Sequence, residues 1–130
     1  MHIESPRKTV SKNKKEVFEF LSNVKNFERL MPENTSKFEV LDEGTFIFAL
    51  KGMPEITLKK KEEIPHEKIV FGAAEGKLDF TLTADIQELT ESSTEVTLHF
   101  NGEFNAMMAM MIKSPITNFI GTLSENLSKV

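Results

Sequence analysis

The sequence of 130 residues contains no cysteine, no tryptophan and no tyrosine. Without cysteine there is no disulfide framework and no thiol nucleophile. Long apolar runs are missing as well, because the longest unbroken one, Ala106 to Ile112, falls far short of the roughly 20 residues of a membrane-spanning helix. The first residues lack the apolar core of a signal peptide. By elimination, we expect a cytoplasmic protein without stable membrane insertion.

Motifs of the common reaction types are also absent. The three histidines, His2, His66 and His99, are far apart in the sequence, and no pattern places two of them beside a carboxylate at metal-ligand spacing. The glycines form no phosphate-binding loop, and no serine lies in a nucleophile elbow. The sequence therefore predicts no metal site, no cofactor and no catalytic residue.

Nucleic acid is a poor candidate for a partner. The formal net charge is −4, so the chain has no general attraction for phosphate backbones. Every aromatic residue is phenylalanine, and most of them fall on apolar faces instead of among basic residues. We therefore expect no nucleic-acid binding.

The strongest positive signal is an apolar stripe at helical spacing in residues 104–130. Its members recur every three or four residues, which places them on one face of a helix. Pro115 removes a backbone donor inside this stripe, but the apolar phase continues past it, so one long kinked helix is expected. The apolar positions are Phe104, Met107, Met108, Met111, Ile112, Ile116, Phe119, Ile120, Leu123, Leu127 and Val130.

The residues before this helix predict strands and two shorter helices. Residues 2–10 read as a first strand, which Pro6 restricts to an edge position or a bulge. Asn13 with Glu16 three residues later matches a helix start, and a second short helix should end at Pro32.

From residue 37 onward, apolar and polar residues alternate in six runs separated by turns, as in an antiparallel meander. The resulting order, β-α-α-β-β-β-β-β-β-α, predicts an α+β fold. A curved antiparallel sheet would wrap around the terminal helix. No linker divides the chain, so a single domain over residues 1–130 is expected.

This order, together with the residues at its joints, resembles the helix-grip superfamily, also called START-like, SRPBCC or birch-pollen-allergen-like. The last part of the chain is similar to small stand-alone bacterial members. The matching segments are residues 13–21, Asn26-Phe27 through Met31-Pro32, Lys51-Gly52-Met53, and residues 105–111 with Pro115 and Asn118-Phe119. The superfamily includes lipid and sterol carriers, plant hormone receptors, polyketide aromatase/cyclases, coenzyme Q-binding proteins and chaperone activators. The resemblance implies an apolar cavity between sheet and helix, and it carries over no catalytic residue, because the branches share none.

Apolar side chains from the strands and the terminal helix are the candidate cavity lining, unless they simply pack as a solid core. An empty cavity of about 300 Å³ would cost ~7 kcal/mol at ~24 cal/mol per Å³, which rivals the net stability of a domain. Any pocket should therefore be small, wet or filled by a ligand. The candidates are Phe46, Phe48, Leu58, Phe71, Phe80, Leu82, Leu98, Phe100, Met108, Met111, Ile112 and Phe119.

Lys60 and Glu62 are the candidate polar groups of the cavity. They share the parity of Ile56, Leu58 and Ile64, so without a bulge their side chains would point to the concave side of the sheet. The alternative is an ordinary solvated charge run.

These patterns predict a protein that binds a small apolar or amphipathic molecule without transforming it. A cyclase- or dehydratase-type enzyme is one alternative, with Lys60, Glu62 and Glu75 as its cavity-facing polar groups. The other is a protein-interaction module, in which the methionine-rich helix start, Met107 to Met111, contacts a partner or a second copy in a homodimer.

Overall fold

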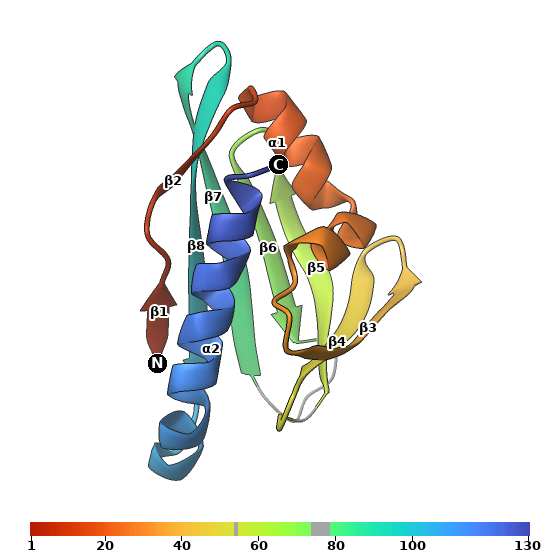
Figure 1. Cartoon of the computed structure of the whole chain (residues 1–130), viewed down its shortest axis with the longest axis vertical. Helices are drawn as coiled ribbons and strands as arrows, with labels where there is room; N and C mark the ends of the chain where they lie inside the picture. Colours follow the sequence, from red (N-terminus) through yellow and green to blue (C-terminus); the bar gives the residue numbers. More distant parts are fainter. Residues whose placement is uncertain (54, 74–78) are drawn as a thin grey trace.

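The computed structural model describes residues 1–53, 55–73 and 79–130, and within them eight strands and three helical segments form an α+β fold (Figure 1). This is the predicted fold class, and the order of elements is the predicted one except that two short strands stand where residues 2–10 were expected to form one. The elements are β1 (His2–Glu4), β2 (Lys8–Val10), α1 (Lys14–Ser22), the 3-10 helix η1 (Val24–Leu30), β3 (Thr35–Asp42), β4 (Thr45–Leu50), β5 (Ile56–Ile64), β6 (Lys68–Ala73), β7 (Asp79–Thr90), β8 (Ser93–Glu103) and α2 (Ala106–Leu127).

The strands form one antiparallel sheet in the order β1-β8-β7-β6-β5-β4-β3, with β2 also paired to β8. Each strand from β3 to β8 pairs with its neighbour in sequence, as the alternating pattern predicted. The amino-terminal residues return to pair with the last strand. This return places the first and last strands of the chain side by side.

The first strand is broken at Pro6 into β1 and β2, both on the outer side of β8. Proline has no N–H to contribute to a ladder, which is why it is tolerated here, at an edge. Ser5 bridges the break, because its N–H donates to Leu98 O at 2.8 Å and its hydroxyl accepts from Leu98 N–H at 2.9 Å.

Asparagine side chains begin all three helical segments. Asn13 accepts from the N–H of Glu16 at 2.9 Å, which confirms the predicted start of α1. Asn23 ends α1 and caps η1, and Asn105 caps α2 by accepting from Met108 N–H at 2.8 Å. The terminal helix therefore begins at Ala106, and it continues through Pro115.

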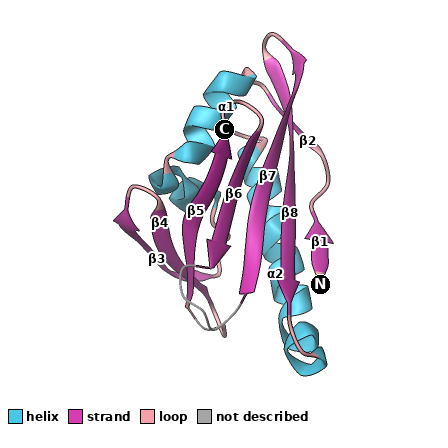
Figure 2. Cartoon of the chain, turned by 180° about the vertical axis from the view of Figure 1, so that it is seen from behind, coloured by secondary structure: helices cyan, strands magenta, loops and turns pink. Residues whose placement is uncertain are grey.

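All three helical segments cover the same face of the sheet, and in the view from behind they lie on the far side of the strands (Figure 2). The second half of α2 lies over the sheet, where the ring of Phe119 stacks on that of Phe48 with centroids 4.7 Å apart. Asn126 Nδ2 donates to Leu30 O at 2.9 Å and ties α2 to η1. The concave side of the sheet therefore holds both the long helix and the short ones.

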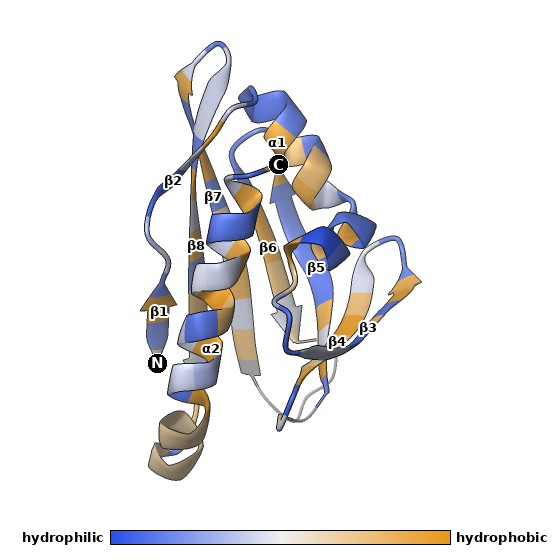
Figure 3. Ribbon diagram, viewed as in Figure 1, coloured by the Kyte–Doolittle hydropathy of each residue, from blue (hydrophilic) through white to orange (hydrophobic). Residues whose placement is uncertain are grey.

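The first turns of α2 project beyond the ends of the strands and are hydrophobic on all sides (Figures 1 and 3). Met107, Met110 and Met111 are 73%, 82% and 67% exposed. The prediction that Met107 and Met111 belong to the buried stripe is wrong, because the sheet does not reach this far. No helix among the described residues is long and apolar enough to cross a bilayer.

Candidate functional site

Nine of the twelve predicted lining residues are buried between the sheet and the helices: Phe46, Phe48, Leu58, Phe71, Phe80, Leu82, Leu98, Phe100 and Phe119. Met108 and Ile112 are half-buried. Met111 is exposed and does not line the interior.

Much of this interior is filled by rings in contact. Phe27, Phe46 and Phe71 form a cluster in which Phe27 is 5.1 Å from Phe46 and 5.2 Å from Phe71, centroid to centroid, and Phe46 is 6.1 Å from Phe71. The void between the sheet, α1, η1 and the end of α2 measures only about 10 Å³, which is the lower limit for one water molecule. Leu21, Phe27, Leu30, Phe71, Leu82, Ala84, Leu98, Leu123 and Leu127 surround it. This part of the interior is a packed core.

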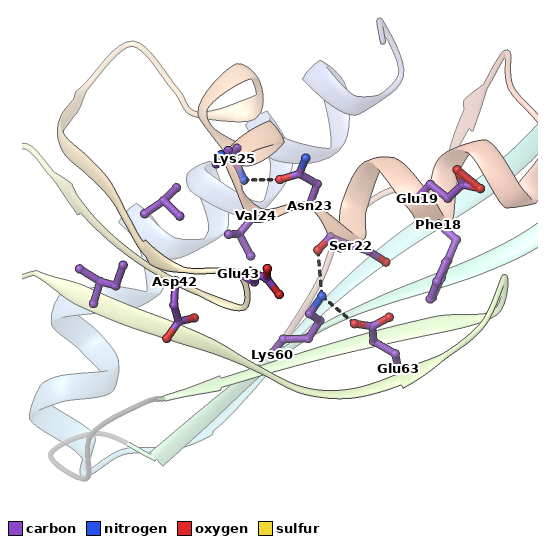
Figure 4. Close-up of a pocket in the computed structure, with 12 residues that line it drawn as sticks. Phe18, Glu19, Ser22, Asn23, Val24, Lys25, Asp42, Glu43, Lys60 and Glu63 are labelled. Carbon is purple, nitrogen blue, oxygen red and sulfur yellow. Dashed lines mark hydrogen bonds and ion pairs between the residues drawn. The ribbon is translucent and has the colours of Figure 1, made fainter.

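A larger space lies beside this core, as a groove of about 720 Å³ open to solvent. The junction of α1 and η1 forms one wall, the β3–β4 turn forms another, and β5 crosses the floor (Figure 4). We call it the α1–β5 groove. Its lining residues are Phe18, Glu19, Ser22, Asn23, Val24, Lys25, Val40, Leu41, Asp42, Glu43, Lys60 and Glu63.

Lys60 lies at the centre of the groove and reaches across it (Figure 4). Its Nζ donates to the carbonyl oxygen of Ser22 at 2.9 Å and pairs with Glu63 Oε1 at 2.6 Å. The side chains of Lys60 and Glu63 are only 20% and 33% exposed. Because Ser22 ends α1, this lysine also satisfies a carbonyl at the helix terminus.

The expectation that Glu62 faces the same side as Lys60 is wrong. Lys60 pairs with Phe71 across the sheet, whereas Glu62 pairs with Val70, so Lys61 is the extra residue of a β-bulge. The bulge reverses the parity, turns Glu62 outward into solvent, and brings Glu63 to the side of Lys60. Glu75, the third polar candidate, lies outside the described residues.

Hydrogen bonds join the β3–β4 turn to the backbone of Lys60. Asp42 Oδ1 accepts from the N–H of Gly44 at 2.9 Å, and Gly44 O accepts from the N–H of Lys60 at 2.7 Å. The Gly44 N–H lowers the pKa of Asp42, and hydrogen bonds from Thr45 and the positive charge of Lys59 act in the same direction. Asp42 is therefore a fixed negative charge on the groove wall.

The groove combines an apolar surface with a surplus of acids. Val24 is buried, Phe18 and Val40 are half-buried, and an edge of the Phe18 ring meets His66 at a centroid distance of 5.7 Å. Four carboxylates and two lysines line the groove, and Lys60 is already paired with Glu63. Such a surface accommodates an apolar body whose polar end is neutral or positive.

The structure also contradicts the expectation that no two histidines meet a carboxylate. His2 and Glu4 of β1 lie beside His99 of β8, and one ligand atom from each falls within 4.8 Å of the others. His99 is about a hundred positions from His2 and Glu4, and the pairing of the first strand with the last brings it to them.

Several solved structures share this fold. Norcoclaurine synthase from Thalictrum flavum, described in complex with dopamine and hydroxybenzaldehyde, superposes with a TM-score of 0.76 at 13% identity over 99% of this chain and 84% of that one. A START superfamily protein from Mycobacterium smegmatis gives a TM-score of 0.72 at 10% identity over 98% and 94%.

The di-domain ARO/CYC protein BexL gives a TM-score of 0.66 at 14% identity over 98% of this chain, which spans 46% of that protein. No protein-family model and no curated protein sequence matches the chain. At these identities the likeness shows the fold, which is the START-like helix-grip fold.

Most of the groove residues were not predicted from the sequence. Lys60 was predicted because it has the same strand parity as Leu58. Glu63 was not predicted, because nothing in the run Lys59-Lys-Lys-Glu-Glu63 indicates the bulge at Lys61. The residues at the end of α1 looked like ordinary polar positions of a helix end. They become groove walls only through the placement of α1 against β5.

Proposed function

We propose that this protein binds, in the cytoplasm, a small amphipathic molecule in the α1–β5 groove and does not transform it. The observation that carries the proposal is the volume of about 720 Å³ lined by both apolar and charged side chains around a half-buried lysine. Pockets for small molecules are commonly about 300–1,000 Å³, mostly apolar, with a few well-placed polar groups.

The groove supports this function better than the packed core does. The void among the core leucines, about 10 Å³, has no room for a guest unless side chains move. The groove, in contrast, offers Phe18, Val40 and Leu41 to an apolar body. We therefore place the binding site in the α1–β5 groove, and not between the sheet and the terminal helix, where the sequence led us to expect it.

Polar recognition would fall to the ion pair at the centre. Lys60 Nζ and Glu63 Oε1 are 2.6 Å apart. An amine or hydroxyl of the ligand can donate to the Glu63 carboxylate, and a ligand oxygen can accept from the Lys60 ammonium group. Asp42 and Glu43 add negative charge at the β3–β4 turn. A neutral or cationic head group fits these charges better than an anionic one.

The likeness to norcoclaurine synthase supports a ligand of this size. That protein is described with dopamine, an aromatic amine, and with hydroxybenzaldehyde. The shared fold therefore accommodates small aromatic molecules in at least one protein of similar shape. An amphipathic aromatic or aliphatic amine is the chemical class that we propose for the groove.

Titration with the uncharged fluorescent dye Nile red tests the proposal, together with native mass spectrometry of the purified protein. We expect saturable dye binding that the groove-filling variant Val40→Phe weakens at least about tenfold, which is the loss of roughly 1.4 kcal/mol. The control is Leu89→Phe, at a residue 46% exposed that does not line the groove. Equal binding by both variants, or neither saturable binding nor a co-purified molecule, would overturn the proposal.

The exposed methionines favour a second candidate function, self-association. Met107, Met110 and Met111 form an apolar surface on the projecting turns of α2, and surfaces of this kind mark contacts. We infer that a second copy of the chain covers them in a homodimer. Sedimentation equilibrium should then show a dimer for the wild type and a monomer for Met110→Glu. A wild type that stays monomeric at high concentration contradicts this candidate.

A further inference from the structure

Two histidines and a glutamate form a cluster on the face of the sheet opposite α1, η1 and α2. His2 and Glu4 lie on β1 with the buried Ile3 between them, so both point away from the core. Glu4 pairs directly with His99 across the β1–β8 ladder. All three positions thus sit on paired strands, which hold them in fixed register at the sheet edge (Figure 2).

The three side chains already lie close to the separation of metal ligands. One ligand atom from each lies within 4.8 Å of the other two, and His99 Nδ1 is 3.8 Å from Glu4 Oε1. Ligands that bind zinc tetrahedrally at ~2.0–2.1 Å are roughly 3.3 Å apart. Small rotations of the exposed side chains of His2 and Glu4 would close this difference.

A second observation shows that His99 is oriented as metal-binding histidines are. Its Nε2 lies 2.9 Å from Asp85 Oδ2 on β7, so this nitrogen carries the proton and donates it to the carboxylate. The lone pair of Nδ1 is then turned towards Glu4. A carboxylate on the far ring nitrogen is the common outer partner of a metal-ligating histidine, because it sets the tautomer and raises the basicity.

His2 is held in a comparable way. Its Nδ1 hydrogen-bonds to Asn101 Oδ1, and because an amide oxygen only accepts, Nδ1 carries the proton and Nε2 keeps its lone pair. The ring centroids of His2 and His99 are 5.6 Å apart, with the planes at 31°. Each imidazole therefore has one nitrogen engaged by a neighbouring oxygen and the other available.

We propose that His2, Glu4 and His99 bind one divalent transition-metal ion of the zinc type, with solvent completing its coordination. Two imidazoles and one carboxylate suit Zn²⁺ and its neighbours in the first row, whereas Mg²⁺ and Ca²⁺ prefer sites made only of oxygen. Asp85 is the positioning residue of this site, and Lys68, whose Nζ is 3.7 Å from Asp85 Oδ1, holds that carboxylate. The site lies on the face opposite the helices and is independent of the α1–β5 groove.

Calorimetric titration of the full chain with Zn²⁺ tests the assignment. We expect one ion per chain, and at least about tenfold weaker binding in His99→Gln and in Glu4→Gln, since each removes one of three ligands. His66→Asn is the matched control, because it removes the remaining histidine, and asparagine tolerates the positive φ of 64° found there. Binding that is unchanged in His99→Gln, or lost equally in His66→Asn, would overturn the proposal, as would no stoichiometric binding by the wild type.

The role of Asp85 has its own test. Asp85→Asn should weaken Zn²⁺ binding by about 10–100-fold, as loss of an outer-shell carboxylate does at known sites. Glu95→Gln, a carboxylate on β8 that pairs with Arg7 outside the cluster, should leave it unchanged. The ring ¹⁵N shifts of His99 should change in Asp85→Asn before metal is added while those of His66 stay in place, whereas a loss of folding would change both.

A measurement on the wild type alone guards against variants that fail to fold. Histidine ring resonances recorded during Zn²⁺ addition should shift together for His2 and His99, while those of His66 stay in place. Mg²⁺ at the same concentration should move none of them. A shift confined to one histidine, or shared by all three, would contradict the three-residue site.

Discussion

Phe119 joins the terminal helix to the sheet, and its truncation is the sharpest test of how the two pack. The side chain is 4% exposed, and its ring stacks on that of Phe48, which is 2% exposed. The two ring planes lie at 10° with centroids 4.7 Å apart. Phe119→Ala therefore removes a ring from the interior and leaves the facing ring uncovered.

The expected loss follows from burial and cavity formation together. Phe→Ala substitutions in packed cores cost ~3–5 kcal/mol, of which an aromatic pair accounts for ~0.5–1.5 kcal/mol. A loss of this size is a large part of a typical net stability of about 5–15 kcal/mol. For a chain of this length it should lower Tm by about 10–20 °C.

Urea unfolding followed by far-ultraviolet circular dichroism is the suitable assay, because the chain has no tryptophan or tyrosine to report by fluorescence. Lys113→Ala serves as the control on the same helix, since Lys113 is exposed and lies outside the methionine surface. Its free energy of unfolding should change by less than about 0.5 kcal/mol. A double-mutant cycle with Phe48→Ala should return a coupling of about 0.5–1.5 kcal/mol.

The reasoning fails if Phe119→Ala costs less than about 1 kcal/mol, which is the range of ordinary surface substitutions plus experimental scatter. Such a result would mean that α2 does not dock on the sheet through this ring. A large loss without coupling to Phe48 would mean that Phe119 is buried against other residues.

Three further predictions concern local geometry. Asn13→Ala removes the cap of α1, so the free energy of unfolding should fall by about 1 kcal/mol in thermal melts, and Asn13→Asp should retain it. Gly52 has φ of 85°, so Gly52→Ala should destabilise by ~1–2 kcal/mol in chemical denaturation, with Gly121→Ala inside α2 as a neutral or stabilising comparison. The pKa of Asp42 is lowered by the Gly44 N–H, so its contribution to stability is present above the unfolded value of about 4 and is lost as pH falls through the folded value. An NMR titration of its carboxyl carbon should show a midpoint below that of an unfolded aspartate, and Asp42→Asn should flatten this part of the stability curve.

The sequence predicted the class and order of the fold because its signals are local. Strand alternation, the cap at Asn13, the edge position set by Pro6 and the helical stripe each depend on neighbours within a few residues, and the elements that they predicted are present in the structure. The stripe misled at Met107 and Met111, which are exposed, and at its two ends, because the helix spans only Ala106–Leu127. Periodicity shows which face of a helix is apolar, but it does not show where the sheet beneath that face ends.

The candidate sites depended on tertiary relations that no local pattern contains. The predicted cavity residues are buried, but their volumes decide whether they enclose a space, and among the core leucines they leave only about 10 Å³. Because Lys61 is an extra residue in β5, the side chain beside Lys60 is that of Glu63 and not that of Glu62. Bulges of this kind follow from how strands pair, so composition alone does not reveal them.

Local physics therefore determined the elements of this protein, their order and their apolar faces, since backbone preference and amphipathic spacing act over a few residues. Only the tertiary structure decided which surfaces meet. It opened a groove beside α1 and brought His2 to His99, because contacts between distant segments depend on strand register and on the shapes of the packed faces.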